Sequence, residues 1–185
     1  MNKFVIGLLC TASILGCNNK KLDSTKAYFS VVDYLNGEVK KIDSLPLHFL
    51  KITAVDSTSD TTEATKEEFN KYAQEFLTIP DIATPRNMKR YTEANDFDET
   101  MNNVLLMYTP KEDDDVVRNE TVMMEPDEGG NTHVKTILVT TVANSGDSTV
   151  EKNLTWHIDK RFQVVTKTSL NGQREKISTV IITWE

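Results

Sequence analysis

The sequence predicts an α+β domain: two N-terminal amphipathic helices and an early strand packed on a six-stranded antiparallel meander sheet. Apolar residues recur at helical spacing in two segments of the first half, whereas strand-like segments separated by short turns follow from residue 103 onward. Short turns force neighbouring strands to run antiparallel. One of these strands has an apolar and a polar face, and such a sheet needs a cover on one side only, which the helices supply.

The first predicted helix spans residues 27–42. Gly37 weakens this helix, because glycine loses more backbone freedom than other residues when it becomes helical. Residues 47–55 (LHFLKITAV) are rich in strand formers and predict the early strand. Residues 56–62 (DSTSDTT) are polar throughout, so we expect a loop there. The apolar residues of the helix recur at steps of three and four: Tyr28, Val31, Val32, Leu35, Val39 and Ile42.

The second helix is predicted from a capping box at Thr65-Lys66-Glu67-Glu68. In this motif the Thr hydroxyl and the Glu carboxylate accept hydrogen bonds from N–H groups that have no partner at a helix start. The helix should end before Pro80. We expect residues 78–101 to be irregular, with a short strand as the alternative. The apolar residues that follow the capping box at helical spacing are Phe69, Tyr72, Ala73, Phe76 and Leu77.

Six strands are predicted in the rest of the chain. The dipeptide Asn171-Gly172 between the last two favours a tight hairpin, because both residue types tolerate the positive φ angles of such turns. In the fourth strand Leu154, Trp156 and Ile158 share one face with Val150, and Lys152 is the exception on that face. The predicted strands are residues 103–109, 116–125, 132–143, 149–158, 162–170 and 175–184.

Composition and charge exclude several classes of protein. With 185 residues, 38% of them apolar, the chain suits one globular domain with a tail. Lys and Arg number 21 against 28 Asp and Glu, which gives a formal net charge of −7. A general nucleic-acid binder needs cations facing phosphates, so we expect no nucleic-acid partner. The sequence carries no signal for a particular oligomeric state.

The N-terminal segment has the features of an export signal. Lys3 supplies one positive charge, and residues 4–16 (FVIGLLCTASILG) follow without any charge. As a helix this stretch would be about 20 Å long, which is too short for a hydrocarbon core of about 30 Å. It fits the apolar region of a cleaved signal peptide instead.

The end of this stretch, Ser13-Ile14-Leu15-Gly16-Cys17, resembles the lipobox of bacterial lipoprotein signal peptides. The resemblance implies that a diacylglycerol is attached to the Cys17 sulfur, that the signal is cleaved between Gly16 and Cys17, and that the new amino terminus is acylated. One acyl chain binds a bilayer only reversibly, whereas two or three anchor a protein stably. The implied partner is therefore the lipid bilayer, reached through acylated Cys17.

The residues after Cys17 indicate which membrane the resemblance implies. In lipoproteins of the enteric type, Asp directly after the acylated cysteine favours the inner membrane, and here that residue is Asn18. The basic pair Lys20-Lys21 differs from the acidic cluster that marks surface-exposed lipoproteins in some Gram-negative groups. The resemblance thus implies a lipid anchor on the periplasmic face of the outer membrane. The chain divides into a cleaved signal peptide (1–16), the lipidated cysteine with a tether (17–26) and a single α+β domain (27–185).

A search for catalytic and metal-binding patterns gives weak candidates only. His48, His133 and His157 stand on separate predicted strands without paired spacing, although His133 and His157 lie on neighbouring strands and could meet. The run Glu112-Asp113-Asp114-Asp115 is typical of a solvated turn, with weak calcium binding as the alternative. The motifs GxSxG, HExxH, CxxC and Walker A are absent from the sequence. We therefore predict no catalytic residue, no metal site and no cofactor.

Three functions are compatible with these patterns. The first is a non-catalytic lipoprotein of the cell envelope that binds another protein or envelope component. The second is a carrier or chaperone for a lipid or other amphiphile, which predicts an apolar cavity under the helices lined by Val150, Leu154 and Trp156. The third is an envelope hydrolase, which predicts carboxyl or histidine groups with shifted pKa values converging in a cleft.

Overall fold

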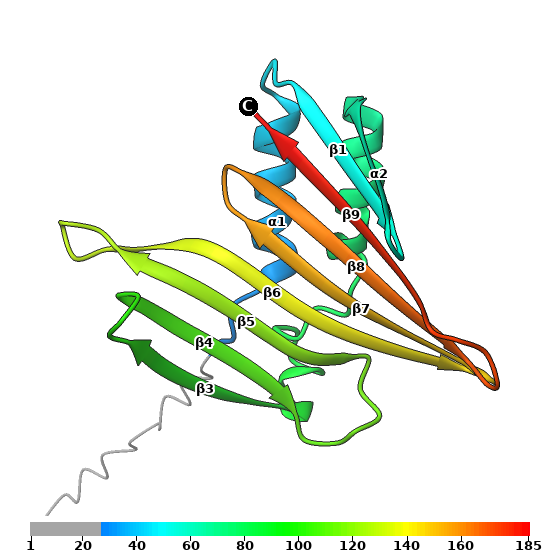
Figure 1. The fold of residues 1–185 in the computed structure, drawn as a ribbon. Coiled ribbons are helices and arrows are strands. Elements are labelled where there is room, and N and C mark those ends of the chain that lie inside the picture. The colour runs from blue at the N-terminus through cyan, green and yellow to red at the C-terminus, as the bar shows by residue number, and fades with distance from the viewer. Residues whose placement is uncertain (1–26) are drawn as a thin grey trace, which may run out of the picture.

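A computed structural model describes residues 27–185 as one antiparallel sheet of nine strands with two α-helices on one face (Figure 1). Gly16 and Cys17, the predicted cleavage and lipid-attachment positions, lie outside the described residues. No helix between residues 27 and 185 is long and apolar enough to cross a membrane. In chain order the elements are α1 (Val31–Asp43), β1 (Phe49–Val55), β2 (Thr58–Ala64), α2 (Lys66–Leu77), the short 3₁₀ helix η1 (Met88–Arg90), β3 (Tyr91–Asp98), β4 (Asn103–Pro110), β5 (Val117–Pro126), β6 (Thr132–Ser145), β7 (Ser148–His157), β8 (Arg161–Leu170) and β9 (Lys176–Trp184).

The strand order is β2-β1-β9-β8-β7-β6-β5-β4-β3, and every neighbouring pair is antiparallel. The hairpin of β1 and β2 forms one edge. The chain then passes through α2 and residues 78–90 to the opposite edge, where β3 begins a meander that returns strand by strand to β9 (Figure 1). Phe49 of β1 is in register with Trp184 of β9, so early and late parts of the chain pair directly.

The prediction of a six-stranded sheet covered by an early strand is wrong. The six predicted strands correspond to β4 through β9, but β1, β2 and β3 belong to the same sheet. β2 forms from polar residues predicted as a loop, and β3 from a segment predicted to be irregular with a short strand as the alternative. Both are edge strands with mostly exposed side chains, so neither has an apolar alternation. Backbone hydrogen bonds to a single neighbour hold them, and polar edges also hinder pairing with other chains.

The two helices begin at side-chain caps. The Oγ of Ser30 accepts a hydrogen bond from the Asp33 N–H at 3.1 Å, so α1 begins after residue 30 and Tyr28 lies outside it. The predicted capping box of α2 is confirmed: Thr65 Oγ1 accepts from the Glu68 N–H, and the Glu68 carboxylate accepts from the Thr65 N–H. Caps of this kind stabilise a helix by about 1 kcal/mol.

A cluster of aromatic rings joins α2 to the sheet, and we call it the aromatic cluster. The Phe76 ring meets the Trp156 ring edge-on, with centroids 5.1 Å apart, and the Phe69 ring lies 5.5 Å from that of Phe162. Four of the five rings are essentially inaccessible to solvent, and Trp184 is 8% exposed. Burial of this kind contributes about 25 cal/mol per Å² of apolar surface. The cluster consists of Phe69, Phe76, Trp156, Phe162 and Trp184.

Ion pairs border the apolar region under α2. Lys152, the exception on its apolar face, reaches Glu75 of α2 with its Nζ 2.5 Å from Oε2. Lys51 of β1 pairs in the same way with Glu68. Each lysine stem covers apolar surface while its charged end reaches a carboxylate of the helix. The charged position in an otherwise apolar strand is thus explained by its helix partner.

Candidate functional site

Two glutamates flank a tyrosine on the helix-bearing face of the sheet. Glu93 of β3 is in register with Tyr108 of β4, which is in register with Glu120 of β5. We call these three residues the carboxyl–phenol row. The same row continues across β6 and β7 as Val139 and Leu154. One line of side chains therefore changes from apolar to acidic as it leaves the part of the sheet under the helices.

Glu120 is the most deeply buried acidic residue of the row. The residue is only 1% exposed, and its Oε1 has no hydrogen-bond partner among residues 27–185. Burial, and secondarily the Asp81 carboxylate, raises the pKa of Glu120 to about 8. Glu120 is therefore mainly protonated and uncharged at neutral pH.

Tyr108 links the row to the N-terminal part of the domain. Its hydroxyl donates to Glu93 Oε1 at 3.1 Å and accepts from the Phe29 N–H at 3.1 Å. Burial is the main reason that the pKa of Tyr108 is raised to about 12. The phenol therefore keeps its proton at neutral pH, and its hydroxyl occupies a fixed position between a carboxylate and a backbone amide.

Residues 27–30 cover the row just before α1 begins. The Tyr28 ring lies 4.9 Å from the Tyr108 ring, and the Tyr28 hydroxyl donates to the Tyr91 carbonyl at 3.0 Å. Ser30 Oγ donates to Asp81 Oδ2 at 3.2 Å. The segment is thereby joined both to the sheet and to the stretch of residues 78–90.

An open cavity of about 580 Å³ lies beside the row, and we call it the tyrosine cavity. Its wall is mainly apolar, and Glu93 belongs both to the cavity wall and to the row. Small-molecule sites have this size and combine an apolar wall with a few polar groups. The residues that line it are Tyr28, Pro85, Met88, Lys89, Tyr91, Thr92, Glu93 and Lys111.

Two lysines provide the positive charge of the tyrosine cavity. Lys89 and Lys111 are both exposed, and Lys111 Nζ donates to the Lys89 carbonyl at 2.8 Å. The neighbouring Arg90 is neutralised by Asp115 at 2.9 Å and by Asp114 at 3.3 Å. Asp115 is only 6% exposed, so the expectation of a solvated acidic turn is wrong for this residue.

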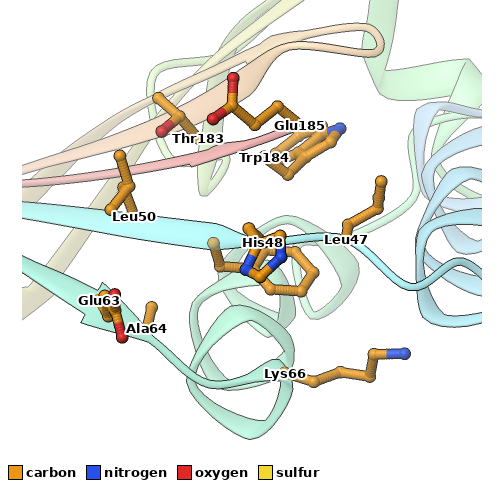
Figure 2. Close-up of a pocket in the computed structure, with 10 residues that line it drawn as sticks. Leu47, His48, Leu50, Glu63, Ala64, Lys66, Thr183, Trp184 and Glu185 are labelled. Carbon is orange, nitrogen blue, oxygen red and sulfur yellow. The ribbon is translucent and has the colours of Figure 1, made fainter.

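A second cavity, of about 480 Å³, lies near the start of β1 and the end of β9 (Figure 2). Here the backbones of His48 and Glu185 exchange hydrogen bonds of 3.0 and 3.2 Å. Figure 2 shows the Lys66 side chain running away from Glu63, and its Nζ donates at 2.6 Å to the carbonyl of Asp43, the last residue of α1. Lys66 and the two backbones therefore already have structural partners, and we regard this cavity as the weaker candidate.

Two of the three histidines line the same cavity. His133 and His157 line one cavity of about 320 Å³ with Glu125 and Asp159, whereas His48 lies in the second cavity. Burial, followed by the charges of neighbouring basic residues, lowers the pKa of His157. Between residues 27 and 185 no group of three or more His, Cys, Asp or Glu side chains is arranged to hold a metal ion.

The residues that the carrier hypothesis places around a cavity under the helices lie mostly in the packed core. Leu154 and Trp156, two of its predicted lining residues, are 1% and 0% exposed and pack in the filled core. The third, Val150, borders only a small cavity of about 190 Å³ beside α2. Aromatic side chains of α2 occupy the space where an acyl chain would lie.

Sequence reasoning missed the carboxyl–phenol row and the tyrosine cavity. One signal was available, because Glu120 shares its strand alternation with Val122, which is buried. The cavity had no such signal, since its residues come from three segments far apart in the chain. Comparison with protein-family models, with curated proteins and with solved structures gives no match.

Proposed function

We propose that the chain is a lipid-anchored, non-catalytic binding module of the cell envelope, and that its ligand site is the tyrosine cavity. The observation that carries the anchor is the run Ser13-Ile14-Leu15-Gly16-Cys17 behind a charge-free stretch. Acylated Cys17 would hold the domain on the periplasmic face of the outer membrane. A protein or other component of the envelope is the expected partner.

The position of the cavity supports this assignment. The proposed tether, residues 18–26, joins the domain directly before Tyr28, which lines the cavity. Fully extended, this tether reaches about 30 Å at roughly 3.3 Å per residue. The cavity would therefore lie within reach of the bilayer surface and of other envelope components.

Burial of the acidic groups supports binding over hydrolysis. The raised pKa of Glu120 is what the hydrolase hypothesis predicts, but the residue is 1% exposed and does not line the cavity. A general acid must come within hydrogen-bond reach of its substrate. Glu93 lines the cavity, yet its Oε1 accepts the phenol hydrogen bond of Tyr108 and its Oε2 is buried.

The anchor is tested by the full chain carrying Cys17→Ser. We expect the wild-type protein to fractionate with membranes and the variant to appear in the soluble fraction, because only the lipid would retain the domain. Cys10→Ser, which changes a cysteine inside the predicted signal, is the matched control and should leave the wild-type distribution unchanged. Mass spectrometry of the mature wild-type N-terminus should find an acylated Cys17. An unmodified Cys17, or membrane retention of the serine variant, would contradict the anchor.

A further inference from the structure

We propose that the tyrosine cavity binds an amphiphile with an anionic head group. A carboxylate or phosphate would lie between Lys89 and Lys111, and a short apolar chain would lie against Tyr28, Met88 and Tyr91. This inference rests on the proposed function, because it assigns a ligand class to the same cavity.

Charge is the first argument. The chain carries a formal net charge of −7, yet two of the three charged residues that line this cavity are lysines. Among residues 27–185 neither Lys89 nor Lys111 forms an ion pair, whereas the adjacent Arg90 has two acidic partners. Two cations with no ion-pair partner in the described part of the chain favour an anion and oppose a cationic ligand.

The arrangement of the lysines is the second argument. Lys111 Nζ lies 2.8 Å from the Lys89 carbonyl, and the Lys111 N–H donates to the Arg90 carbonyl at 2.8 Å. The turn after β4 is thereby joined to η1. The Lys111 ammonium is held beside the backbone of Lys89, and an ammonium group keeps further donors for an anion.

Glu93, the one acidic residue that lines the cavity, determines the orientation of the ligand. Its Oε1 is occupied by the Tyr108 hydroxyl at 3.1 Å, and its Oε2 is buried. The Glu93 carboxylate is thereby held at the row, next to the Tyr108 hydroxyl. An anionic head group is repelled from this carboxylate, so the head lies at the lysines and the chain lies inward.

The apolar wall is the third argument. Met88 is partly buried, and an unbranched thioether adapts to chains of different shape. The Tyr28 ring is fixed by its contact with Tyr108 and by the hydrogen bond of its hydroxyl to the Tyr91 carbonyl. An inorganic anion would leave this wall unused, so the observations favour an amphiphile over a bare phosphate.

The test uses the full chain with Cys17→Ser, so that no acyl chain of its own competes. Isothermal titration calorimetry is carried out with decanoate, decyltrimethylammonium and inorganic phosphate. We expect decanoate to bind, phosphate to bind at least about tenfold more weakly, and the cationic probe not to bind. Decanoate affinity should also fall with rising salt, because the attraction of exposed charges is screened.

Matched variants locate the binding. Lys89→Gln with Lys111→Gln should weaken decanoate binding about tenfold. Lys40→Gln with Lys176→Gln removes two exposed lysines elsewhere and should change nothing. Met88→Gln should weaken decanoate more than phosphate. All changed side chains are at least partly exposed, and urea unfolding should show wild-type stability for each variant.

The outcomes separate this inference from the proposed function. Equal binding of the cationic probe, or decanoate binding unaffected by the Lys89 and Lys111 changes, would overturn the ligand class and leave the cavity as a site. No binding of any probe would overturn both the ligand class and the cavity, whereas the anchor is decided by the Cys17 fractionation.

A sedimentation experiment with vesicles that contain or lack phosphatidylglycerol distinguishes a bilayer lipid from a free amphiphile. If the protein sediments with anionic vesicles and the Lys89 and Lys111 changes abolish this, the ligand is a bilayer lipid. If the protein binds decanoate but does not sediment with vesicles, the ligand is a free amphiphile.

Discussion

One half of the sheet is covered by helices and the other by loops, and the chemistry beneath the two covers differs. Under the helices the central row of side chains is Leu154 and Val164, whereas under the loops the same row is Glu93, Tyr108 and Glu120. A helix satisfies its own backbone groups and contributes apolar side chains to its contact face. A loop brings backbone groups that need partners.

The Phe29 amide is the clearest instance of this difference. It belongs to the segment before α1 and donates to the Tyr108 hydroxyl at 3.1 Å, so a polar residue of the sheet satisfies a backbone group of the cover. On the helix side Phe69 and Phe76 contact the Trp156 ring through apolar side chains and bring no backbone amide to it. The helix-covered half supplies stability, and the loop-covered half supplies polar groups next to a cavity.

Trp156→Ala is the largest expected perturbation of the helix-covered half. It removes the ring that contacts Phe69, Phe76, Phe162 and Trp184, and should lower the free energy of unfolding by about 5 kcal/mol. Urea unfolding followed by far-ultraviolet circular dichroism measures the change. Phe97→Ala, at a residue 48% exposed on β3, is the control and should change stability by about 0.5 kcal/mol or less. Similar losses at both positions would contradict the placement of Trp156 in the buried core.

Glu120→Gln tests the buried acid of the loop-covered half. Its folded-state pKa of about 8 lies above the ordinary value of 4.5, so the native protein retains a proton that the unfolded chain loses between these pH values. This contribution to stability is complete below pH 4.5 and is lost as pH rises toward 8, by roughly 4 kcal/mol.

The measurement is urea unfolding of both proteins at pH 5 and pH 8. The glutamine variant lacks the titration, so its stability should fall less than that of the wild type between these pH values. Equal pH dependence in the two proteins would show that Glu120 titrates normally.

Tyr108→Phe should have an intermediate effect. It removes the hydroxyl that hydrogen-bonds to Glu93 and to the Phe29 amide. Both partners are partly buried, so the loss should lower the free energy of unfolding by about 2 kcal/mol. Tyr72→Phe, on the partly exposed face of α2, is the matched control. Amide hydrogen exchange should rise at Phe29 in the Tyr108 variant only. Unchanged exchange there would mean that residues 27–30 are held by other contacts.

Thr65→Ala is the smallest change and acts on the helix-covered half. It removes the side-chain half of the capping box and should lower the free energy of unfolding by about 1 kcal/mol. Thr62→Ala, an exposed β2 residue without a cap, is the control in the same urea experiment. A loss larger than that of Tyr108→Phe would reverse the expected order.

Much of the fold was predictable because side-chain burial leaves a local pattern. The capping box at Thr65 and the periodicity after it place α2, and the Asn171-Gly172 turn separates β8 from β9, with Gly172 at φ +75°. β2 and β3 were not predictable in this way, since edge strands with exposed side chains show no alternation. The carboxyl–phenol row was also hidden, because an acidic residue in a strand is ordinarily on the solvent face.

By itself the sequence determined the two helices, seven of the nine strands, the acidic balance and the resemblance of the segment ending at Cys17 to a lipobox, since each depends on neighbours along the chain. Only the tertiary structure decided that β1 pairs with β9, that polar segments close both edges, and that Glu93, Tyr108 and Glu120 lie in one row. The physical reason is that strand pairing is set by how backbones and apolar faces from distant segments fit together. No local pattern records which strands become neighbours.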